Sequence, residues 1–266
     1  MHPLEFRVVD LPAASLHKAV VLVLGQYRAV LVGAGLRLSD GRRLVREVER
    51  SGRRLAAVLV ADHAADSWLA AEVLRDAFPE ARFLAPASVL ARIEREHAAV
   101  RAGWAGLGAE LPSRLVALEP LPEDAVELED HRLELRGASL GLPDRHYLWE
   151  HRSRTLLGGP LLRQDVHLWL ADTPRPAERI AWIDLLDEMA ALEPLRTVPG
   201  HRRPDAAGPE PIGWTGDYLR AFETELGKPV PAELVEAALL GRFPTAALPG
   251  LVGPGVRAAR AELAAA

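Results

Sequence analysis

The feature that most constrains this chain is a regular alternation of short apolar runs with amphipathic segments in its first hundred residues. Aliphatic and β-branched runs of strand length occupy residues 20–24, 29–32, 55–60 and 82–85. Apolar residues at helical spacing follow over residues 41–51, where Ser39 is the expected N-cap, and over 68–78 and 88–97. The Gly25-containing turn between the first two runs predicts a hairpin. Strands that alternate with helices predict a layered α/β arrangement.

The second half of the sequence has a different pattern, in which strands dominate before helices return. Short strand-like pieces divided by Pro, Gly and Asp are expected at 115–118, 125–128, 131–135, 147–150 and 155–157, which favours an antiparallel meander. We expect helices at 176–192, 214–226 and 232–240, a strand at 197–201, a crossing loop at 202–213 and an Ala-rich tail that trails off after Gly255. The chain is therefore predicted to form one domain over 1–213, with a helical C-terminal extension over 214–266 packed on it.

Composition removes several functional classes. The 266 residues include 37 acidic and 32 basic side chains, a formal net charge of −5, so we expect no binding to nucleic acid or to an anionic membrane. Cysteine is absent, which excludes disulfides, thiolate metal sites and a cysteine nucleophile. The apolar stretch at 19–24 is far shorter than a membrane span, and no basic-then-apolar leader precedes it. We expect a cytoplasmic protein that binds a small molecule, and homodimer formation stays open.

Residues 58–68 form a strand, a turn dense in Asp and His, and a helix that starts at Trp68, and they resemble the metallo-β-lactamase fold superfamily. The family pattern there is T-H-x-H-x-D-H, followed by H-T or H-S in a later turn, G-D after a strand and P-G-H near the end. Segments at 139–149, 155–160, 166–171, 182–201 and 214–242 resemble a hydrolase-like subgroup in the same order. The resemblance covers most of the chain and implies an α/β fold of the αββα sandwich type, with mixed sheets flanked by helices.

The resemblance also locates the positions that hold two zinc ions in the family. Carried over one by one, these positions are occupied here by Asp62, Ala64, Asp66, Ser67, Leu142, Gly159 and His201. Only Asp66 and His201 keep a family-type ligand, and Asp62 is a chemically possible substitute. A complete structural zinc site is worth roughly 10–16 kcal/mol, so two of four ligands would leave about half of that and bind zinc no more tightly than about micromolar. We predict no stable dinuclear zinc centre and no cofactor.

A shifted ligand set is the alternative that would preserve metal chemistry. A single zinc ion could be held by Asp62, Asp66 and His201, or by a set that adds His63 and His146, which lie close in sequence to lost ligands. Adjacent residues of an extended chain point to opposite sides, so His63 is offset from the expected site. A mononuclear metal-dependent hydrolase therefore stays open.

The two retained residues suggest chemistry without metal. If the fold holds, Asp66 and His201 face each other, and a carboxylate beside an imidazole orients the ring and can make it a general acid or base. The sequence thus predicts hydrolase-, cyclase- or lyase-like activity on a small organic substrate, with Asp66 and His201 as the catalytic residues. Candidate substrate-binding residues are Asp62, His63, Trp68, His146, His167 and Trp169.

A non-catalytic pseudoenzyme that binds a ligand or a partner is the alternative from a different class. Zinc supplies both the nucleophile and the oxyanion stabilisation in the family's chemistry, and most of its ligands are lost. The Asp66–His201 pair would then be a polar contact between two loops. A deep cleft at this pair would favour the enzyme, whereas a site closed by Leu142 and other apolar side chains would favour the pseudoenzyme.

Overall fold

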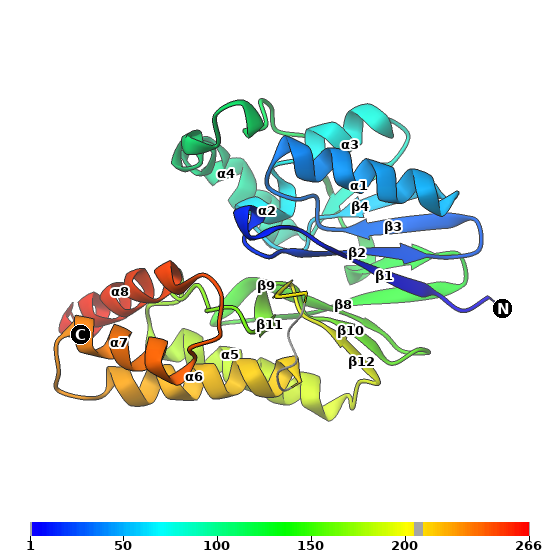
Figure 1. The fold of residues 1–266 in the computed structure, drawn as a ribbon. Helices are drawn as coiled ribbons and strands as arrows, with labels where there is room; N and C mark the ends of the chain where they lie inside the picture. The colour runs from blue at the N-terminus through cyan, green and yellow to red at the C-terminus, as the bar shows by residue number, and fades with distance from the viewer. Residues whose placement is uncertain (1, 205–209, 266) are drawn as a thin grey trace.

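The computed structural model describes residues 2–204 and 210–265, which form four layers in the order helices, sheet, sheet, helices (Figure 1). The helices are α1 (Leu38–Ser51), α2 (Ala65–Trp68), α3 (Ala71–Ala77), α4 (Ala87–Gly103), α5 (Pro176–Ala191), α6 (Pro211–Leu226), α7 (Ala232–Arg242) and α8 (Val252–Ala265). Helices α1, α3 and α4 lie over the first sheet, and α5 and α6 lie under the second. The predicted αββα sandwich is confirmed. None of the described helices is both long and apolar enough to cross a lipid bilayer.

The first sheet is mixed, with the strand order β1-β2-β3-β4-β5-β6. Its strands are β1 (Glu5–Asp10), β2 (Ala19–Leu24), β3 (Arg28–Val32), β4 (Arg54–Leu59), β5 (Arg82–Ala85) and β6 (Glu119–Pro120). The first three pair antiparallel, which confirms the hairpin, and β3 to β6 run parallel. Strand β2 is apolar throughout because both its faces are covered: Val20 and Leu22 join the core under α1 and α3, and Val21 and Val23 join the core between the sheets.

The second sheet has the order β12-β10-β9-β8-β7 and contains the predicted meander. Its strands are β7 (Ala125–Leu128), β8 (His131–Ser139), β9 (Leu142–Glu150), β10 (Thr155–Leu157) and β12 (Arg196–Val198). Only β10 and β12 pair parallel, and the other neighbours are antiparallel. A separate parallel pair, β11 (Arg163–Gln164) with β13 (His201–Arg202), lies beside this sheet and carries one of the retained family residues.

The C-terminal helices share a core with the second sheet. Trp149 of β9 and Trp182 of α5 belong to the same apolar cluster as Tyr218 of α6 and Val256 of α8. Helix α6 begins at Pro211, so the predicted boundary at 213/214 falls inside it. Helix α8 also corrects the expectation that the Ala-rich tail trails off, because its buried side chains recur at helical spacing and anchor it to this core. Residues 205–209 of the predicted crossing loop lie outside the described residues.

Two predicted helices differ from the observed ones in their ends. Ser39 does not cap α1; the carboxylate of Asp40 accepts the backbone N–H groups of Leu36 and Arg37 instead. The predicted helix at 68–78 is divided into α2 and α3, because the N–H of Ala70 donates to the carbonyl of Gly35 rather than to its own helix.

Two predicted strands are also corrected. Residues 115–118 pair with no neighbour, and the strand in this region is the short β6, which starts at Glu119. The predicted strand at 197–201 is divided into β12 and β13 by Pro199 and Gly200. This break lets β12 pair with the second sheet while β13 pairs with β11.

Candidate functional site

The turn after β4 and the short helix α2 position three polar side chains between the two sheets. The Asp62 carboxylate accepts the N–H of Ala64 (2.9 Å), an Asx-type turn that fixes the entry to α2. Helix α2 then carries Asp66 and Ser67, and all three polar side chains are buried. The Ser67 hydroxyl donates to Asp62 Oδ2 (2.7 Å), so the turn and the helix are tied together.

The structure brings Asp66 and His201 together. The imidazole Nε2 of His201 lies 2.6 Å from Asp66 Oδ2, and each residue is only 2% exposed. Burial and the nearby Arg163 guanidinium lower the pKa of His201 to about 4. Burial alone would raise the pKa of Asp66, but the Lys18 ammonium and His201 outweigh it and hold this pKa well below its usual range. At neutral pH a neutral imidazole therefore donates its Nε2 proton to a carboxylate, and Nδ1 has no hydrogen-bond partner in the described part of the chain.

Lys18, which the sequence analysis did not identify, lies at the centre of this site. Its Nζ donates to Ser67 Oγ (2.7 Å) and lies 3.3 Å from Asp66 Oδ1 and 3.7 Å from Asp62 Oδ2, while its side chain is only 5% exposed. We refer to Lys18, Asp62, Asp66, Ser67 and His201 as the Lys18 cluster. The ammonium occupies the space between the carboxylates that remain from the family's ligand set.

Backbone contacts fix Lys18 opposite the segment that carries His201. The two residues form an antiparallel bridge, and the N–H of Ala19 donates to the carbonyl of Gly200. Lys18 is also one of only two lysines in the chain, the other being Lys228, although 32 residues are basic. This exception to a strong arginine preference was the sequence signal, because an ammonium is a compact charge and a guanidinium is a larger planar fork.

The residues present do not fit the metal centre of the family. Among residues 2–204 and 210–265, no group of three or more His, Asp or Glu side chains is placed to hold a metal ion. The position of the bridging carboxylate is Gly159, whose φ of +51° disfavours any side chain, and a Cβ there would lie 3.0 Å from the carbonyl oxygen of His146. A Cβ on Gly200 would lie 2.0 Å from the Gly159 carbonyl oxygen, so these two loops are in direct backbone contact.

The space beside the Lys18 cluster is small. A cavity of about 30 Å³ borders Lys18, Asp62 and Ser67, which is enough for about one or two water molecules. Aliphatic side chains of both sheets close it, among them Val21 and Leu157. Leu142 does not take part in this closure, since it belongs to the core on the α5 side of the second sheet.

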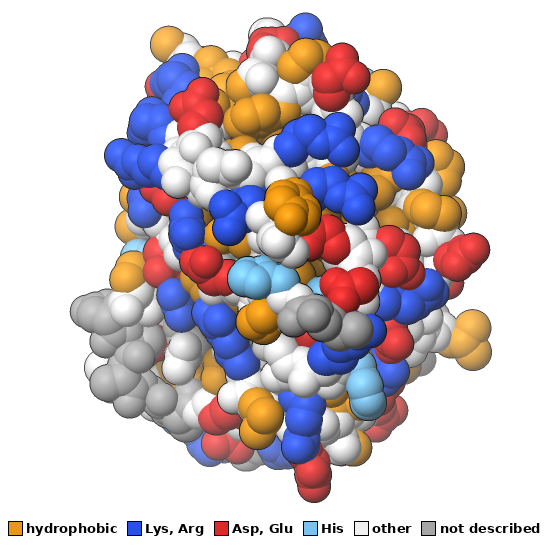
Figure 2. All heavy atoms as spheres, turned by 90° about the vertical axis from the view of Figure 1, so that its right-hand side faces the viewer, with side chains coloured by type: hydrophobic (Ala, Val, Ile, Leu, Met, Phe, Trp, Pro, Cys, Tyr) orange, Lys and Arg blue, Asp and Glu red, His pale blue; other side chains and the backbone are white. Residues whose placement is uncertain are grey.

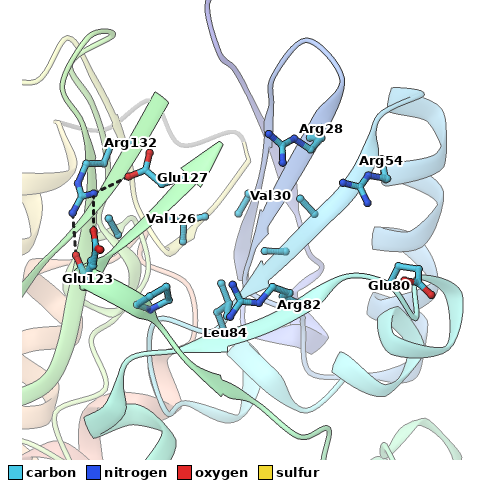
Figure 3. A pocket seen from close by; sticks show the side chains of 14 residues that line it. Arg28, Val30, Arg54, Glu80, Arg82, Leu84, Glu123, Val126, Glu127 and Arg132 are labelled. Atoms are coloured by element: carbon cyan, nitrogen blue, oxygen red, sulfur yellow. Dashed lines mark hydrogen bonds and ion pairs between the residues drawn. The ribbon is translucent and has the colours of Figure 1, made fainter. Parts of the chain in front are cut away.

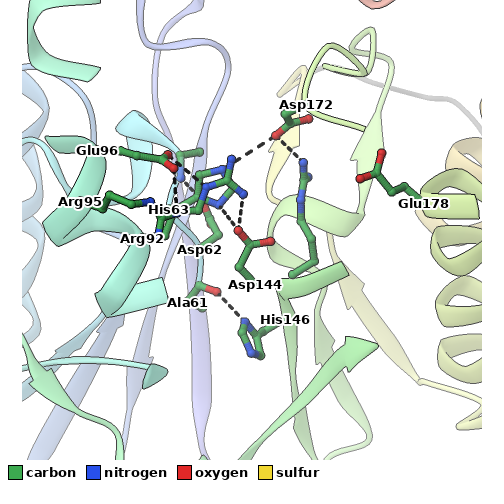
Figure 4. Close-up of polar contacts among 12 residues, drawn as sticks. Ala61, Asp62, His63, Arg92, Arg95, Glu96, Asp144, His146, Asp172 and Glu178 are labelled. Atoms are coloured by element: carbon green, nitrogen blue, oxygen red, sulfur yellow. Dashed lines mark hydrogen bonds and ion pairs between the residues drawn. The ribbon is translucent and has the colours of Figure 1, made fainter. Parts of the chain in front are cut away.

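His63 and His146 make contacts with groups outside the Lys18 cluster (Figure 4). The His63 ring faces Asp144, with 3.2 Å between Nδ1 and Oδ2, and its Nε2 is 3.9 Å from Asp172 Oδ2. Burial and the nearby Arg92 guanidinium, opposed by the carboxylates of Asp144 and Asp62, lower the pKa of His63. The His146 Nδ1 lies 3.3 Å from the carbonyl oxygen of Ala61. The structure therefore does not gather the shifted ligand set around one point.

The remaining candidate binding residues lie in three different surroundings. Trp68 is buried in the core beside α4, and its indole N–H donates to the carbonyl of His63 (3.0 Å). His167 is buried against α6, with Nδ1 2.9 Å from the Tyr218 hydroxyl, and burial lowers its pKa to about 4. Trp169 is 38% exposed. The binding roles of these side chains stay predictions.

Comparison with known proteins agrees with this architecture. The sequence matches the family model of the metallo-beta-lactamase superfamily over residues 16–201. No curated protein matches it significantly. Among solved structures, a metallo-beta-lactamase family protein from Thermus thermophilus has a TM-score of 0.69 and 19% identity, covering 98% of this chain and 93% of that one.

Two further structures show the same fold. A beta-lactamase domain protein from Burkholderia ambifaria has a TM-score of 0.65 and 15% identity, covering 98% of this chain and 86% of that one. The B3 metallo-beta-lactamase BLEG-1 has a TM-score of 0.57 and 16% identity, covering 80% of this chain and 97% of that one. Because the family match spans well over half of the sequence, the chain belongs to the metallo-β-lactamase superfamily.

Proposed function

We propose that this chain is a non-catalytic member of its superfamily, which acts by binding a ligand or a partner, and in which the Lys18 cluster stabilises the fold. The observation that carries the proposal is the position of the Lys18 ammonium, within 3.7 Å of both remaining carboxylates in a buried site. A side chain of this protein thus supplies the positive charge that the carboxylates require.

The charges around the cluster balance without a metal ion. Two buried carboxylates, Asp62 and Asp66, face two buried cations, Lys18 and Arg163, and His201 is neutral at pH 7. A buried charge without a partner costs several kcal/mol, so this balance is what makes the cluster compatible with a stable interior. A divalent cation at the same point would be repelled by the ammonium and would leave a net positive charge in the core.

The arrangement also limits catalysis by the side chains themselves. The Ser67 hydroxyl donates to Asp62 and accepts from Lys18, and it is 1% exposed. Because Lys18 Nζ donates to the Ser67 hydroxyl, it is not placed to accept the hydroxyl proton. The cavity of about 30 Å³ beside Lys18, Asp62 and Ser67 is too small for an organic substrate. Neither Ser67 nor Lys18 is therefore placed to act as a nucleophile or as a base.

Zinc content and turnover test this proposal directly. The purified protein is incubated with zinc, passed through a desalting column and assayed for bound metal and for hydrolysis of an ester, a thioester and a β-lactam. We expect far less than one zinc per chain and turnover equal to that of a His201→Gln variant. Stoichiometric zinc, or turnover that falls in His201→Gln, would overturn the proposal.

A zinc-independent enzyme is the second candidate, and one observation favours it. His201 Nε2 is held 2.6 Å from Asp66, which leaves Nδ1 as a lone pair oriented by a carboxylate partner. A small organic substrate that reached Nδ1 could lose a proton to it in a hydrolase-, cyclase- or lyase-like reaction. With a pKa of about 4, such a base gives a kcat/KM that rises through pH 4 and is level at neutral pH. Asp66→Asn would remove that activity, and a flat profile through pH 4 would exclude His201 as the base.

A further inference from the structure

A second, much larger cavity lies at the other end of the sandwich. It has a volume of about 500 Å³ and opens between the two sheets, where β3, β4 and β5 begin and where β7 and β8 pass opposite (Figure 3). The Lys18 cluster lies beyond the carboxyl ends of the same parallel strands, so the two sites occupy opposite edges of the first sheet. Ligand binding in the larger cavity is therefore independent of whether Asp66 and His201 are catalytic.

Two arginines stand side by side at this edge of the sheet. Arg28 and Arg54 are the first residues of β3 and β4, and they are direct partners in the strand register. Both are exposed and line the cavity, and neither guanidinium has a hydrogen bond or ion pair to any described residue. The Glu129 carboxylate lies within electrostatic range of Arg28, but its oxygens are engaged by the backbone N–H groups of residues 26–28. Like charges on directly paired positions are destabilising, so the fold alone does not account for this pair.

The other two arginines at the cavity, Arg82 and Arg132, already have carboxylate partners. Arg82, which begins β5, donates to Glu119 through two nitrogens at 2.9 and 2.7 Å. On the opposite wall, Arg132 donates to Glu127 at 2.7 Å and lies 3.7 Å from Glu123. Figure 3 shows the Arg132 group across the cavity from Arg28 and Arg54. Figure 2 shows basic side chains gathered on the upper half of this end of the molecule, with acidic ones between them.

The walls between these charges are apolar, and alanines are among the residues that form them. Val30, Ala57 and Leu84 line the cavity from the first sheet, and Ala125 and Val126 line it from the second. Small side chains in the core between the sheets leave the space that larger aliphatic residues fill elsewhere. The volume lies in the range of known small-molecule sites, which are mostly apolar with a few placed polar groups.

We propose that this cavity binds a small monocarboxylate with an apolar tail, whose carboxylate is held by Arg28 and Arg54 and whose tail lies along the alanine and valine walls. Guanidinium groups match a carboxylate with two parallel hydrogen bonds. The residues that line the cavity include four arginines and three glutamates, a net charge of +1. A net charge of +1 is neutralised by a ligand with a single negative charge. A dianion would be repelled more strongly by the three glutamates.

Calorimetric titration of the full chain with sodium octanoate tests the proposal. We expect saturable binding of one octanoate per chain, weakened at least tenfold in the double variant Arg28→Gln/Arg54→Gln. Ala56→Leu narrows the cavity from a half-buried position and is expected to weaken binding while both arginines remain. The matched control is Arg43→Gln/Arg46→Gln, two exposed arginines on α1 outside the cavity, which should leave the affinity unchanged.

Three companion ligands separate the contributions of charge and tail. Acetate and octan-1-ol each lack one half of the proposed ligand and should bind at least tenfold more weakly than octanoate, and octyl phosphate should also bind more weakly because of its second charge. The proposal is overturned if octanoate does not bind, if acetate binds as tightly as octanoate, or if octyl phosphate binds more tightly. It is equally overturned if the arginine double variant, shown by circular dichroism to be folded, keeps the wild-type affinity.

Discussion

The charged side chains at the two edges of the first sheet have opposite surroundings. At the carboxyl ends of its parallel strands, Lys18 is surrounded by Asp62, Asp66 and Ser67, and the space left is about 30 Å³. At the amino ends, Arg28 and Arg54 stand together without a hydrogen-bonded partner in the described chain, beside a cavity of about 500 Å³. Opposite charges that pair in a buried cluster can stabilise the fold. Two like charges beside a cavity are instead free to bind a ligand of opposite charge.

Backbone geometry explains part of this difference. At the carboxyl edge, the loops around Gly159 and Gly200 touch through their main chains, and Lys18 is bridged to His201, so several segments converge on one point. At the amino edge, the first sheet faces β7 and β8 across small residues such as Ala57 and Ala125, and the sheets leave a gap. In this chain the two sheets are thus closed together beside the Lys18 cluster and leave a cavity at the opposite edge.

Removal of the Lys18 ammonium should have the largest effect on either edge. Lys18→Met keeps the length of the side chain but leaves two buried carboxylates without their cation, and breaking a buried ion pair in this way costs about 3–5 kcal/mol. Urea unfolding measures the loss. Lys228→Met, at an exposed i,i+3 pair with Glu225, is the matched control and should cost less than about 0.5 kcal/mol. A loss below about 1 kcal/mol in Lys18→Met would contradict a stabilising role for the cluster.

Acidification should weaken the closed edge next. The pKa of His201 is lowered to about 4 in the folded protein, against an ordinary value of 6.5 for an unperturbed histidine. The unfolded chain therefore takes up a proton as the pH falls from 6.5 to 4 while the folded chain does not, and stability is lost over this window. A difference of this size corresponds to about 3 kcal/mol. Unfolding at a series of pH values should show a shallower slope in His201→Gln, and an unchanged slope would count against the buried neutral imidazole.

Loss of the Ser67 hydroxyl should have an intermediate effect. Ser67→Ala removes one hydrogen bond to Asp62 and one from Lys18, both involving charged groups in a buried site. Such bonds contribute about 1.5–3 kcal/mol, so we expect a loss in that range in urea unfolding. Ser139→Ala is the control: the Ser139 hydroxyl is buried without a partner among the described residues, so its removal should not destabilise the protein. Equal losses in both variants would show that Ser67 is not part of a specific network.

The elements that were predictable from sequence are those whose burial follows from local periodicity. Strand β2 is buried on both faces and reads as one unbroken apolar run, and β5 was predicted with its observed ends. The predictions that were wrong concern elements whose bounds depend on contacts with residues distant in the sequence. The break between α2 and α3 depends on the Gly35 carbonyl, and α8 depends on the core beneath it, which local propensity in an Ala-rich tail does not reveal.

The candidate site was predictable only in part, for the same reason. The family resemblance located Asp62, Asp66 and His201, and the structure places them within one cluster. Lys18 lies more than forty residues before its carboxylate partners, and a lysine that precedes a strand is ordinarily a solvated strand end. The paired arginines were missed for a related reason, since Arg28 and Arg54 become neighbours only through the parallel register of β3 and β4.

The smallest predicted effect has the opposite sign and separates the two edges most clearly. Arg54→Gln removes one of two like charges that face each other across β3 and β4, so the protein without ligand should gain about 0.2–1 kcal/mol in its free energy of unfolding. Arg82→Gln, one strand further along the same edge, breaks the bond to Glu119 and should instead lose about 0.2–1 kcal/mol. Both changes are measured by urea unfolding at low salt, and added salt should reduce each of them because the groups are exposed. If Arg54→Gln also destabilised the protein, Arg54 would have a structural partner, and the two edges would then differ in the size of their cavities but not in how they use charge.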